Sequence, residues 1–140
     1  MQPIRTSAAD FSSVIKINPK HASAYSNRGS AYWHIGDNDK AIADFDQALK
    51  SDPKNVAAYT YRGNSHYAKG DYDRAIHDYD QAIKLDPKNV SAFTERGNTF
   101  ALRGKIDRAL QDYEQAIRFN PTFACVFTSR AMLWKRKGDL

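Results

Sequence analysis

Arginine and aspartate recur along the chain at a fixed interval of 34 residues. The arginines are Arg28, Arg62 and Arg96, and the aspartates are Asp44, Asp78 and Asp112. A guanidinium can form two parallel hydrogen bonds with one carboxylate, so the two series predict structural ion pairs, either within one structural unit or between neighbouring units. The same arginines could bind phosphate only if the carboxylates left them free. We therefore expect structural ion pairs and no nucleic-acid partner.

Residue types that commonly catalyse reactions or bind metals do not form a set in this chain. The four histidines lack the spacing of metal ligands, and Cys125 is the single cysteine, so an internal disulfide is impossible. The glycines recur at the 34-residue interval and do not form a phosphate-binding loop. We therefore expect no catalytic residue, no metal ion, no cofactor and no enzymatic activity.

The composition is that of an ordinary globular protein, with 41% hydrophobic and 26% charged residues. The net charge is +5, and the basic residues are interleaved with acidic ones along the chain, which is typical of a solvated surface. No apolar run approaches the roughly 20 residues that span a bilayer, and the first residues do not have the pattern of a signal peptide. We expect no membrane partner and a cytoplasmic location, which the single cysteine also fits.

The 34-residue interval extends to further residue types, which indicates an internal repeat. Proline follows it at Pro19, Pro53, Pro87 and Pro121. Glycine follows it in two series, one at Gly29, Gly63 and Gly97 and the other at Gly36, Gly70, Gly104 and Gly138. Alanine does so at Ala41, Ala75 and Ala109, and again at Ala48, Ala82 and Ala116. So many residue types would not share one period by accident.

Each repeat predicts two helices, as residues 56–89 illustrate. Apolar and small residues recur at helical spacing in both halves of this unit. Gly70 is suited to end the first helix in a left-handed conformation, and Asp71 is placed to cap the second. The second helix is expected to end before Pro87, because the residue preceding a proline is disfavoured in the α conformation. Asn89 is then placed to cap the first helix of the following unit.

Small residues in the same unit predict close packing between helices. Gly63 and Ala75 are expected where the two backbones of one hairpin approach closely, and Ala82 where the next repeat packs. A larger side chain at these positions would overpack the interface. Tyr79 and Ile83 are expected to fill the remaining space.

This pattern resembles the tetratricopeptide repeat family over nearly the whole chain. The first matching set is Tyr25, Gly29, Tyr32, Ala41, Phe45, Ala48 and Pro53. The next two sets are Tyr59, Gly63, His66, Ala75, Tyr79, Ala82 and Pro87, and Phe93, Gly97, Phe100, Ala109, Tyr113, Ala116 and Pro121. His66 departs from the large residue usual at its position, and the three arginines occupy a position where many members carry leucine. The resemblance implies an all-α fold, a right-handed α-solenoid of antiparallel helix hairpins with about eight helices.

The register of the repeat predicts one domain, residues 1–140, with incomplete units at both ends. The three full repeats are residues 22–55, 56–89 and 90–123, residues 7–18 look like the second helix of a preceding repeat, and residues 124–137 look like a first helix without a partner.

The last helix is expected to leave Phe127, Leu133 and Trp134 partly uncovered, although the terminal repeat of a solenoid normally has a polar outer face. Two explanations remain open. The chain is a piece of a longer protein, or the last helix of one molecule packs against the first helix of another in a head-to-tail contact.

The resemblance also implies that the first helix of each hairpin lines a concave groove. The expected groove residues are Asn27, Ser30, Trp33, His34, Tyr61, Asn64, Tyr67, Thr94, Glu95 and Asn98. Asparagine amides can both donate to and accept from a peptide backbone, and the aromatic residues can anchor a ligand. Alternatively, these side chains are solvated or pack on neighbouring helices.

The predicted function is a protein-interaction scaffold that binds a peptide or protein segment in this groove. Family members that bind the C-terminal carboxylate of heat-shock chaperones use lysine where this chain has Ser26, Thr60 and Thr94, and Glu95 would repel such a ligand. That co-chaperone role is therefore not expected. A regulatory or substrate-recruiting module of a larger enzyme and a self-associating solenoid remain alternatives.

Overall fold

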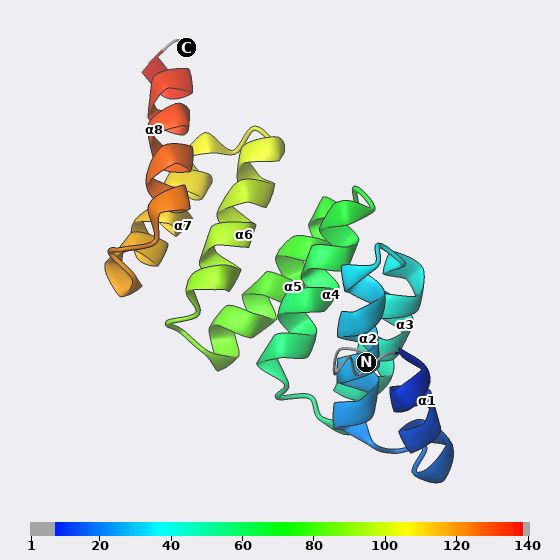
Figure 1. Cartoon of the computed structure of the whole chain (residues 1–140). Coiled ribbons are helices and arrows are strands. Elements are labelled where there is room, and N and C mark those ends of the chain that lie inside the picture. The colour runs from blue at the N-terminus through cyan, green and yellow to red at the C-terminus, as the bar shows by residue number, and fades with distance from the viewer. Residues whose placement is uncertain (1–7, 139–140) are drawn as a thin grey trace, which may run out of the picture.

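The computed structural model describes residues 8–138, which form eight α-helices and no strand. The helices are α1 (Ala8–Ile17), α2 (Ala22–His34), α3 (Asn38–Ser51), α4 (Val56–Ala68), α5 (Tyr72–Leu85), α6 (Val90–Leu102), α7 (Ile106–Phe119) and α8 (Ala124–Gly138). They stack in chain order, so α1 and α8 lie at opposite ends of the stack (Figure 1). The prediction of an all-α solenoid is confirmed. Of the stretch expected at 7–18, residue 7 lies outside the described residues.

Contacts between helices determine which side of the stack is concave. Each of the helices α2, α4 and α6 packs against the helix that follows it, which completes a hairpin. The helices α2, α4, α6 and α8 also contact one another in succession, whereas among the described residues α3, α5 and α7 make no such contacts with each other. A stack whose first helices converge while its second helices spread apart must curve. The first helices therefore lie on the concave side (Figure 1).

Side-chain caps set the starts of most helices. Asn55 and Asn89 each accept a hydrogen bond at 3.0 Å from a backbone N–H in the first turn of α4 and α6. Asp71 accepts one from the backbone N–H of Arg74 and so caps α5. Lys105 occupies the corresponding position before α7 and makes no side-chain cap. Gly70 has a φ of 79°, the left-handed conformation expected after the first helix.

The two helices of each hairpin approach closely at a glycine. A Cβ atom added to Gly63 would lie 2.7 Å from Cε1 of Tyr79, and one added to Gly97 would lie 2.8 Å from Cε1 of Tyr113. Ala75 and Tyr79 are completely buried beside this contact. The glycine thus makes room for an aromatic ring between the helices, because any larger residue would force the ring to move.

Arg28, Arg62 and Arg96 bind the described hairpins together from within. Each donates two hydrogen bonds to the aspartate sixteen residues later, which lies on the second helix of the same hairpin. For Arg62, Nε and Nη2 lie 2.9 and 2.7 Å from the two carboxylate oxygens of Asp78. Its remaining nitrogen, Nη1, donates at 2.8 Å to Asp46 on α3 of the preceding hairpin. The guanidinium therefore acts both within a repeat and between repeats, and carboxylates occupy all of its nitrogens.

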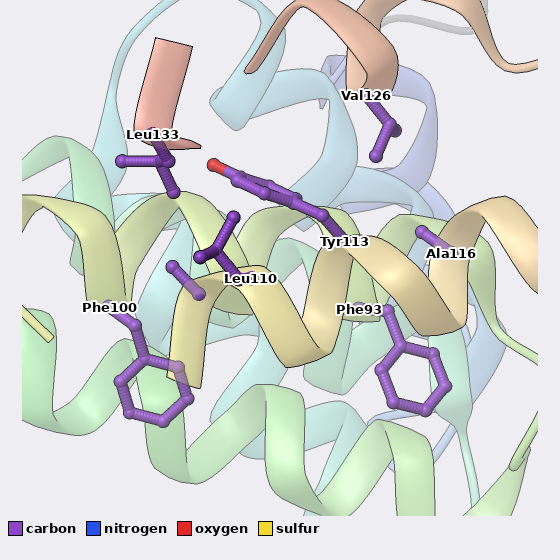
Figure 2. Packing of buried hydrophobic residues seen from close by; sticks show 8 residues of the cluster. Phe93, Phe100, Leu110, Tyr113, Ala116, Val126 and Leu133 are labelled. Carbon is purple, nitrogen blue, oxygen red and sulfur yellow. The ribbon is translucent and has the colours of Figure 1, made fainter. Parts of the chain in front are cut away.

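The last helix is more deeply seated than its sequence suggested. Val126 and Leu133 of α8 pack on the side of Tyr113 in the cluster formed with α6 and α7 (Figure 2). Leu133 is only 4% exposed, so the expectation that it is partly uncovered was wrong. Helix α8 packs on α7 in the same way as α4 packs on α3 and α6 on α5, and this contact buries Leu133. Phe127 and Trp134 remain 37% and 53% exposed, as expected. Between residues 8 and 138, no helix is long and apolar enough to cross a membrane.

Candidate binding groove

Two asparagines at equivalent places on α4 and α6 are held by tyrosines of the following helices. The Tyr79 hydroxyl donates to Asn64 Oδ1 at 2.7 Å, and the Tyr113 hydroxyl donates to Asn98 Oδ1 at 2.5 Å. Burial raises the pKa of both tyrosines, that of Tyr113 to about 12, so both hydroxyls keep their protons at neutral pH. Both amides are half-buried. Each Oδ1 accepts one hydrogen bond, which fixes the orientation of the amide, and Nδ2 is the donor that a ligand could meet, with one of the two N–H groups of Asn98 already bonded to Glu95.

The first full repeat replaces both members of this pair. Phe45 stands where the later repeats have tyrosine, and Ser30 stands where they have asparagine. Phe45 has no hydroxyl to donate, so this repeat cannot form the tyrosine–amide bond. Asn27 lies one turn earlier on α2 and is exposed. The three asparagines expected in the groove therefore differ. Asn27 is exposed, whereas Asn64 and Asn98 are each held by a tyrosine hydroxyl.

An aromatic cluster lies at the α2 end of the groove. The rings of Trp33 and Tyr61 are 5.2 Å apart between centroids, and Tyr61 stacks on the buried Phe45 at 6.1 Å. His34 lies 4.8 Å from Trp33 in an edge contact, and its Nδ1 is 2.7 Å from the Ser30 backbone oxygen. Trp33 and Tyr61 are half-buried. Neighbouring rings hold them in place, and each still has surface to offer to a ligand.

Tyr67 of α4 and Glu95 of α6 are two further residues of the expected groove. Tyr67 contacts Tyr72 of α5 at 5.6 Å between ring centroids. Glu95 is half-buried on α6 and accepts a hydrogen bond from Asn98. Burial raises the pKa of the Glu95 carboxyl, and the bond from Asn98 offsets this only in part. Burial also raises the pKa of Tyr67, with a further contribution from the charge of Glu95.

One expected groove residue is not accessible. Thr94 is only 7% exposed, and its hydroxyl donates at 2.8 Å to the Val90 backbone oxygen of its own helix. Thr60, one repeat earlier, does the same toward Val56 at 3.0 Å. The assignment of Thr94 to the exposed wall was therefore wrong, because this helical position is buried and its hydroxyl is bonded within its own helix.

Sequence reasoning missed the hydrogen bonds of Tyr79 and Tyr113 to the asparagines, since Tyr79 was expected only to fill space and Tyr113 was noted only as a match to the repeat. A signal was present in the sequence. Tyrosine occurs where the residue fifteen positions earlier is asparagine, and phenylalanine occurs where it is serine. The buried hydroxyl needs an acceptor, and only the longer amide side chain supplies one.

Other chemistry finds little support in the described residues. No group of three histidine, cysteine or acidic side chains within residues 8–138 could hold a metal ion. A depression over α3, α4 and α5 is lined by charged residues that include Asp46, Arg62 and Asp78. These groups already pair with one another, so the depression presents no free charge of theirs to a ligand.

Three sequence-family models match the chain between residues 22 and 123. One described as "Tetratricopeptide repeat" matches residues 22–55 and 90–123, and a second with the same description matches residues 45–77. A third, described as "TPR repeat", matches residues 63–102. No curated protein matches the chain significantly.

Solved structures with the same fold are numerous. A crystal structure of MamA superposes with a TM-score of 0.90 at 24% identity, over 94% of this chain and 77% of that one. The second TPR domain of human RPAP3, in complex with an HSP70 peptide, gives 0.76 at 26% identity, over 80% of this chain and 93% of that one. The first TPR of Spaghetti (RPAP3), bound to an HSP90 peptide, gives 0.82 at 21% identity, over 84% of this chain and 93% of that one.

Proposed function

Because the chain belongs to the tetratricopeptide repeat family, we propose that it is a protein-interaction scaffold whose concave groove binds an extended polypeptide segment. The observation that carries the proposal is the pair of fixed amides, Asn64 and Asn98. They stand at the same position of successive repeats, and a tyrosine hydroxyl holds each one by its oxygen. An amide held in this way offers its N–H groups to a backbone carbonyl without first losing rotamer freedom. Spaced amides of this kind can hold a chain whatever its side chains are.

The aromatic cluster supplies the second part of the proposed site. The ring of Trp33 packs on that of Tyr61, and Tyr61 stacks on the buried Phe45, so both rings are ordered before a ligand binds. Large side chains that are already ordered give contact area at low entropic cost, which is why aromatic residues dominate binding hot spots. We therefore place an apolar anchor of the ligand at the α2 end of the groove.

The related RPAP3 domains are described with HSP90 and HSP70 peptides. They support a polypeptide ligand for this chain, but the ligand class proposed here differs. Ser26 and Thr60 stand where chaperone-binding members of the family carry a lysine, and Glu95 adds a negative charge to the groove. An acidic C-terminus would therefore find a repelling carboxylate. Tetratricopeptide repeat scaffolds are generally not enzymes, and we propose no catalytic role.

The proposal is tested with peptides selected on the wild-type chain from a random dodecapeptide library displayed on phage. Replacing Asn64→Ala and Asn98→Ala together should weaken their binding at least tenfold, which corresponds to about 1.4 kcal/mol for the lost hydrogen bonds. The matched control is Gln47→Ala with Gln111→Ala, because both amides are exposed on second helices. If the two double variants bind equally well, the groove is not the site.

Loss of binding must be separated from loss of folding, because Asn64→Ala also leaves the buried Tyr79 hydroxyl without its acceptor. Asn64→Asp serves this purpose. A carboxylate keeps an acceptor for Tyr79 but has no N–H to donate. We expect it to keep more stability than Asn64→Ala, because Tyr79 retains an acceptor, and still to bind the selected peptides more weakly than the wild type. Unchanged binding by Asn64→Asp would contradict the donor role.

A second mode of binding, self-association through the end helices, is favoured by exposed apolar side chains. Met132 and Trp134 of α8 are 64% and 53% exposed, and Ile17 of α1 is 87% exposed. Apolar surface of this size gains free energy when a second molecule covers it. Sedimentation over a concentration series tests this, and Trp134→Glu should shift the distribution to monomer. A wild-type chain that stays monomeric at the highest concentrations would exclude it.

The proposed compartment is the cytoplasm. Cys125 is exposed and has no disulfide partner, and such thiols persist in reducing compartments. Microscopy of the tagged protein in its native cells checks the location.

A further inference from the structure

Glu95 differs from the other buried and half-buried acidic residues within residues 8–138. The buried Asp78 and Asp112 are each paired with an arginine at 2.7 Å. The half-buried Asp37 and Asp71 each have a basic nitrogen within 4.0 Å, from Lys40 and Arg74. Glu95 is half-buried as well, yet within residues 8–138 no lysine, arginine or histidine nitrogen lies within 4.0 Å of it. Its carboxyl accepts a hydrogen bond from the neutral amide of Asn98.

A carboxylate in this position carries a cost that its surroundings do not offset. Burial removes the water that stabilises the charged carboxylate, and a hydrogen bond from a neutral amide stabilises it less than a nearby cation would. The raised pKa of Glu95 reflects this deficit. In the core of the same protein, an arginine pairs with each of the buried carboxylates, Asp44, Asp78 and Asp112. What is missing at Glu95 is a counter-charge.

The surroundings of Glu95 are suited to a cationic side chain. Burial raises the pKa of the half-buried Tyr67, and the charge of Glu95 adds to this rise, which places the two groups near each other. Tyrosine rings attract cations through their faces. Apart from His34, the other residues assigned to the groove are uncharged, so nothing among them competes for the carboxylate. A single carboxylate is also too few ligands for a metal ion.

We propose that the groove selects polypeptide segments that carry a lysine or arginine, and that the cation of this side chain binds the Glu95 carboxylate beside Tyr67. The inference rests on the proposed function and adds the chemistry of the partner to it. The fixed amides of Asn64 and Asn98 hold the backbone of the segment, and Glu95 determines which side chain is accepted between them. A segment with an acidic residue at that place is rejected.

The test uses the same phage-displayed dodecapeptide library on three chains: wild type, Glu95→Gln and Glu114→Gln. Glu114 is the other glutamate of the sequence, and it is exposed on α7, so it is a matched control. Peptides selected on the wild type and on Glu114→Gln should carry lysine or arginine at one fixed position. Peptides selected on Glu95→Gln should not.

A quantitative arm measures the coupling directly. The lysine or arginine of a selected peptide is replaced by glutamine, and both peptides are titrated into both chains. On the wild type we expect this replacement to weaken binding at least about tenfold, as for a charge-assisted hydrogen bond. On Glu95→Gln the two peptides should bind equally. Equal losses on both chains, or no enrichment of basic residues on the wild type, would overturn the inference.

Stability separates recognition from a structural role of Glu95. The folded protein disfavours the charged carboxyl, so Glu95→Gln should have a thermal midpoint equal to or above that of the wild type. A lower midpoint would mean that the carboxylate supports the fold. Failure of the proposed function can be distinguished from failure of this inference. If the proposed function is wrong, either no peptide is selected or the selected peptides bind regardless of Asn64 and Asn98.

Discussion

The Tyr79 hydroxyl donates a hydrogen bond of 2.7 Å to Asn64 Oδ1, which links the buried face of the second helix of a repeat to its first helix. The ring of Tyr79 is completely buried, and only its hydroxyl reaches the amide. Packing inside the hairpin therefore determines which way a proposed binding group is turned. In the next repeat, the Tyr113 hydroxyl donates the equivalent hydrogen bond to Asn98 Oδ1.

A double-mutant cycle on this pair should show coupling. Tyr79→Phe removes one hydrogen bond and should cost about 1 kcal/mol of unfolding free energy. In that background, Asn64→Ser reproduces the combination found in the first repeat, Phe45 with Ser30. We expect the double variant to lose at least about 0.5 kcal/mol less than the sum of the single losses, because the second change removes a partner already lost. Urea denaturation measures all four chains, and strictly additive losses would mean that the bond contributes nothing.

The core ion pairs should be expensive to break one partner at a time. In Arg62→Leu, the Asp78 side chain, 2% exposed, would be left buried without its counter-charge. We expect a loss of about 3 kcal/mol or more, since an uncompensated buried charge costs about 3–5 kcal/mol. Adding Asp78→Leu should restore much of the lost stability, because it removes that charge. Chemical denaturation of the single and double variants checks both expectations.

The control for the core pair is an ion pair of the same type at the surface. Arg103 lies 3.2 Å from Asp73, with side chains 41% and 77% exposed. Water screens this pair, so Arg103→Ala should cost less than about 1 kcal/mol. If both arginine replacements cost the same, the burial argument fails.

The glycine in the hairpin contact should not tolerate even a methyl group. In Gly63→Ala, the new Cβ would lie 2.7 Å from the Tyr79 ring. Overpacking costs about 1–3 kcal/mol, and the better helix propensity of alanine returns at most about 1 kcal/mol. We therefore expect a net loss of stability. Gly138→Ala is the control, since no atom lies within 4 Å of its added Cβ, and its thermal midpoint should not fall.

The sequence predicted the all-α solenoid because its information is local and repeated. Gly70 and Asn89 act through the backbone of a single turn, so their spacing alone predicts a cap. Helical periodicity then assigns the buried faces, and the repeat supplies three copies of the same pattern.

The groove was harder to predict because its properties depend on which neighbouring helix each side chain faces. Thr94 and Glu95 are adjacent in the sequence, yet Thr94 is buried with its hydroxyl bonded to Val90 of its own helix, whereas Glu95 is only half-buried. Leu133 is buried because α8 lies on α7, which periodicity within α8 could not reveal. The partner of Asn64 lies fifteen residues away on another helix. Exposure of this kind is a property of packing between helices, not of one helix.

Stability should depend on the protonation of His66. This residue is only 9% exposed, and burial lowers its pKa from 6.5, while the charge of Asp78 acts in the opposite direction and is outweighed. A lowered folded pKa means that the unfolded chain binds the proton more readily. As pH falls below 6.5, stability from the neutral imidazole is therefore lost, and the loss is complete below the folded pKa.

The comparison chain is His66→Phe, which cannot titrate at this position. The difference in unfolding free energy, wild type minus His66→Phe, should be constant at neutral pH and should decrease as pH falls below 6.5. Denaturation at a series of pH values measures it, and the other histidines cancel because both chains contain them. A difference that stays flat, or that grows in acid, would contradict the burial of a neutral imidazole.

The third hairpin should gain stability from a helix cap that the other two already have. Asp37 and Asp71 accept a backbone hydrogen bond at the start of α3 and α5, whereas Lys105 before α7 makes none and places a positive charge at the helix N-terminus. Lys105→Asp should therefore stabilise the protein by about 1 kcal/mol, the usual value of a side-chain N-cap. Lys105→Ala separates the two contributions, because it removes the charge without adding a cap, and it should gain less. Urea denaturation measures both, and a Lys105→Asp chain no more stable than Lys105→Ala would show that the cap does not form.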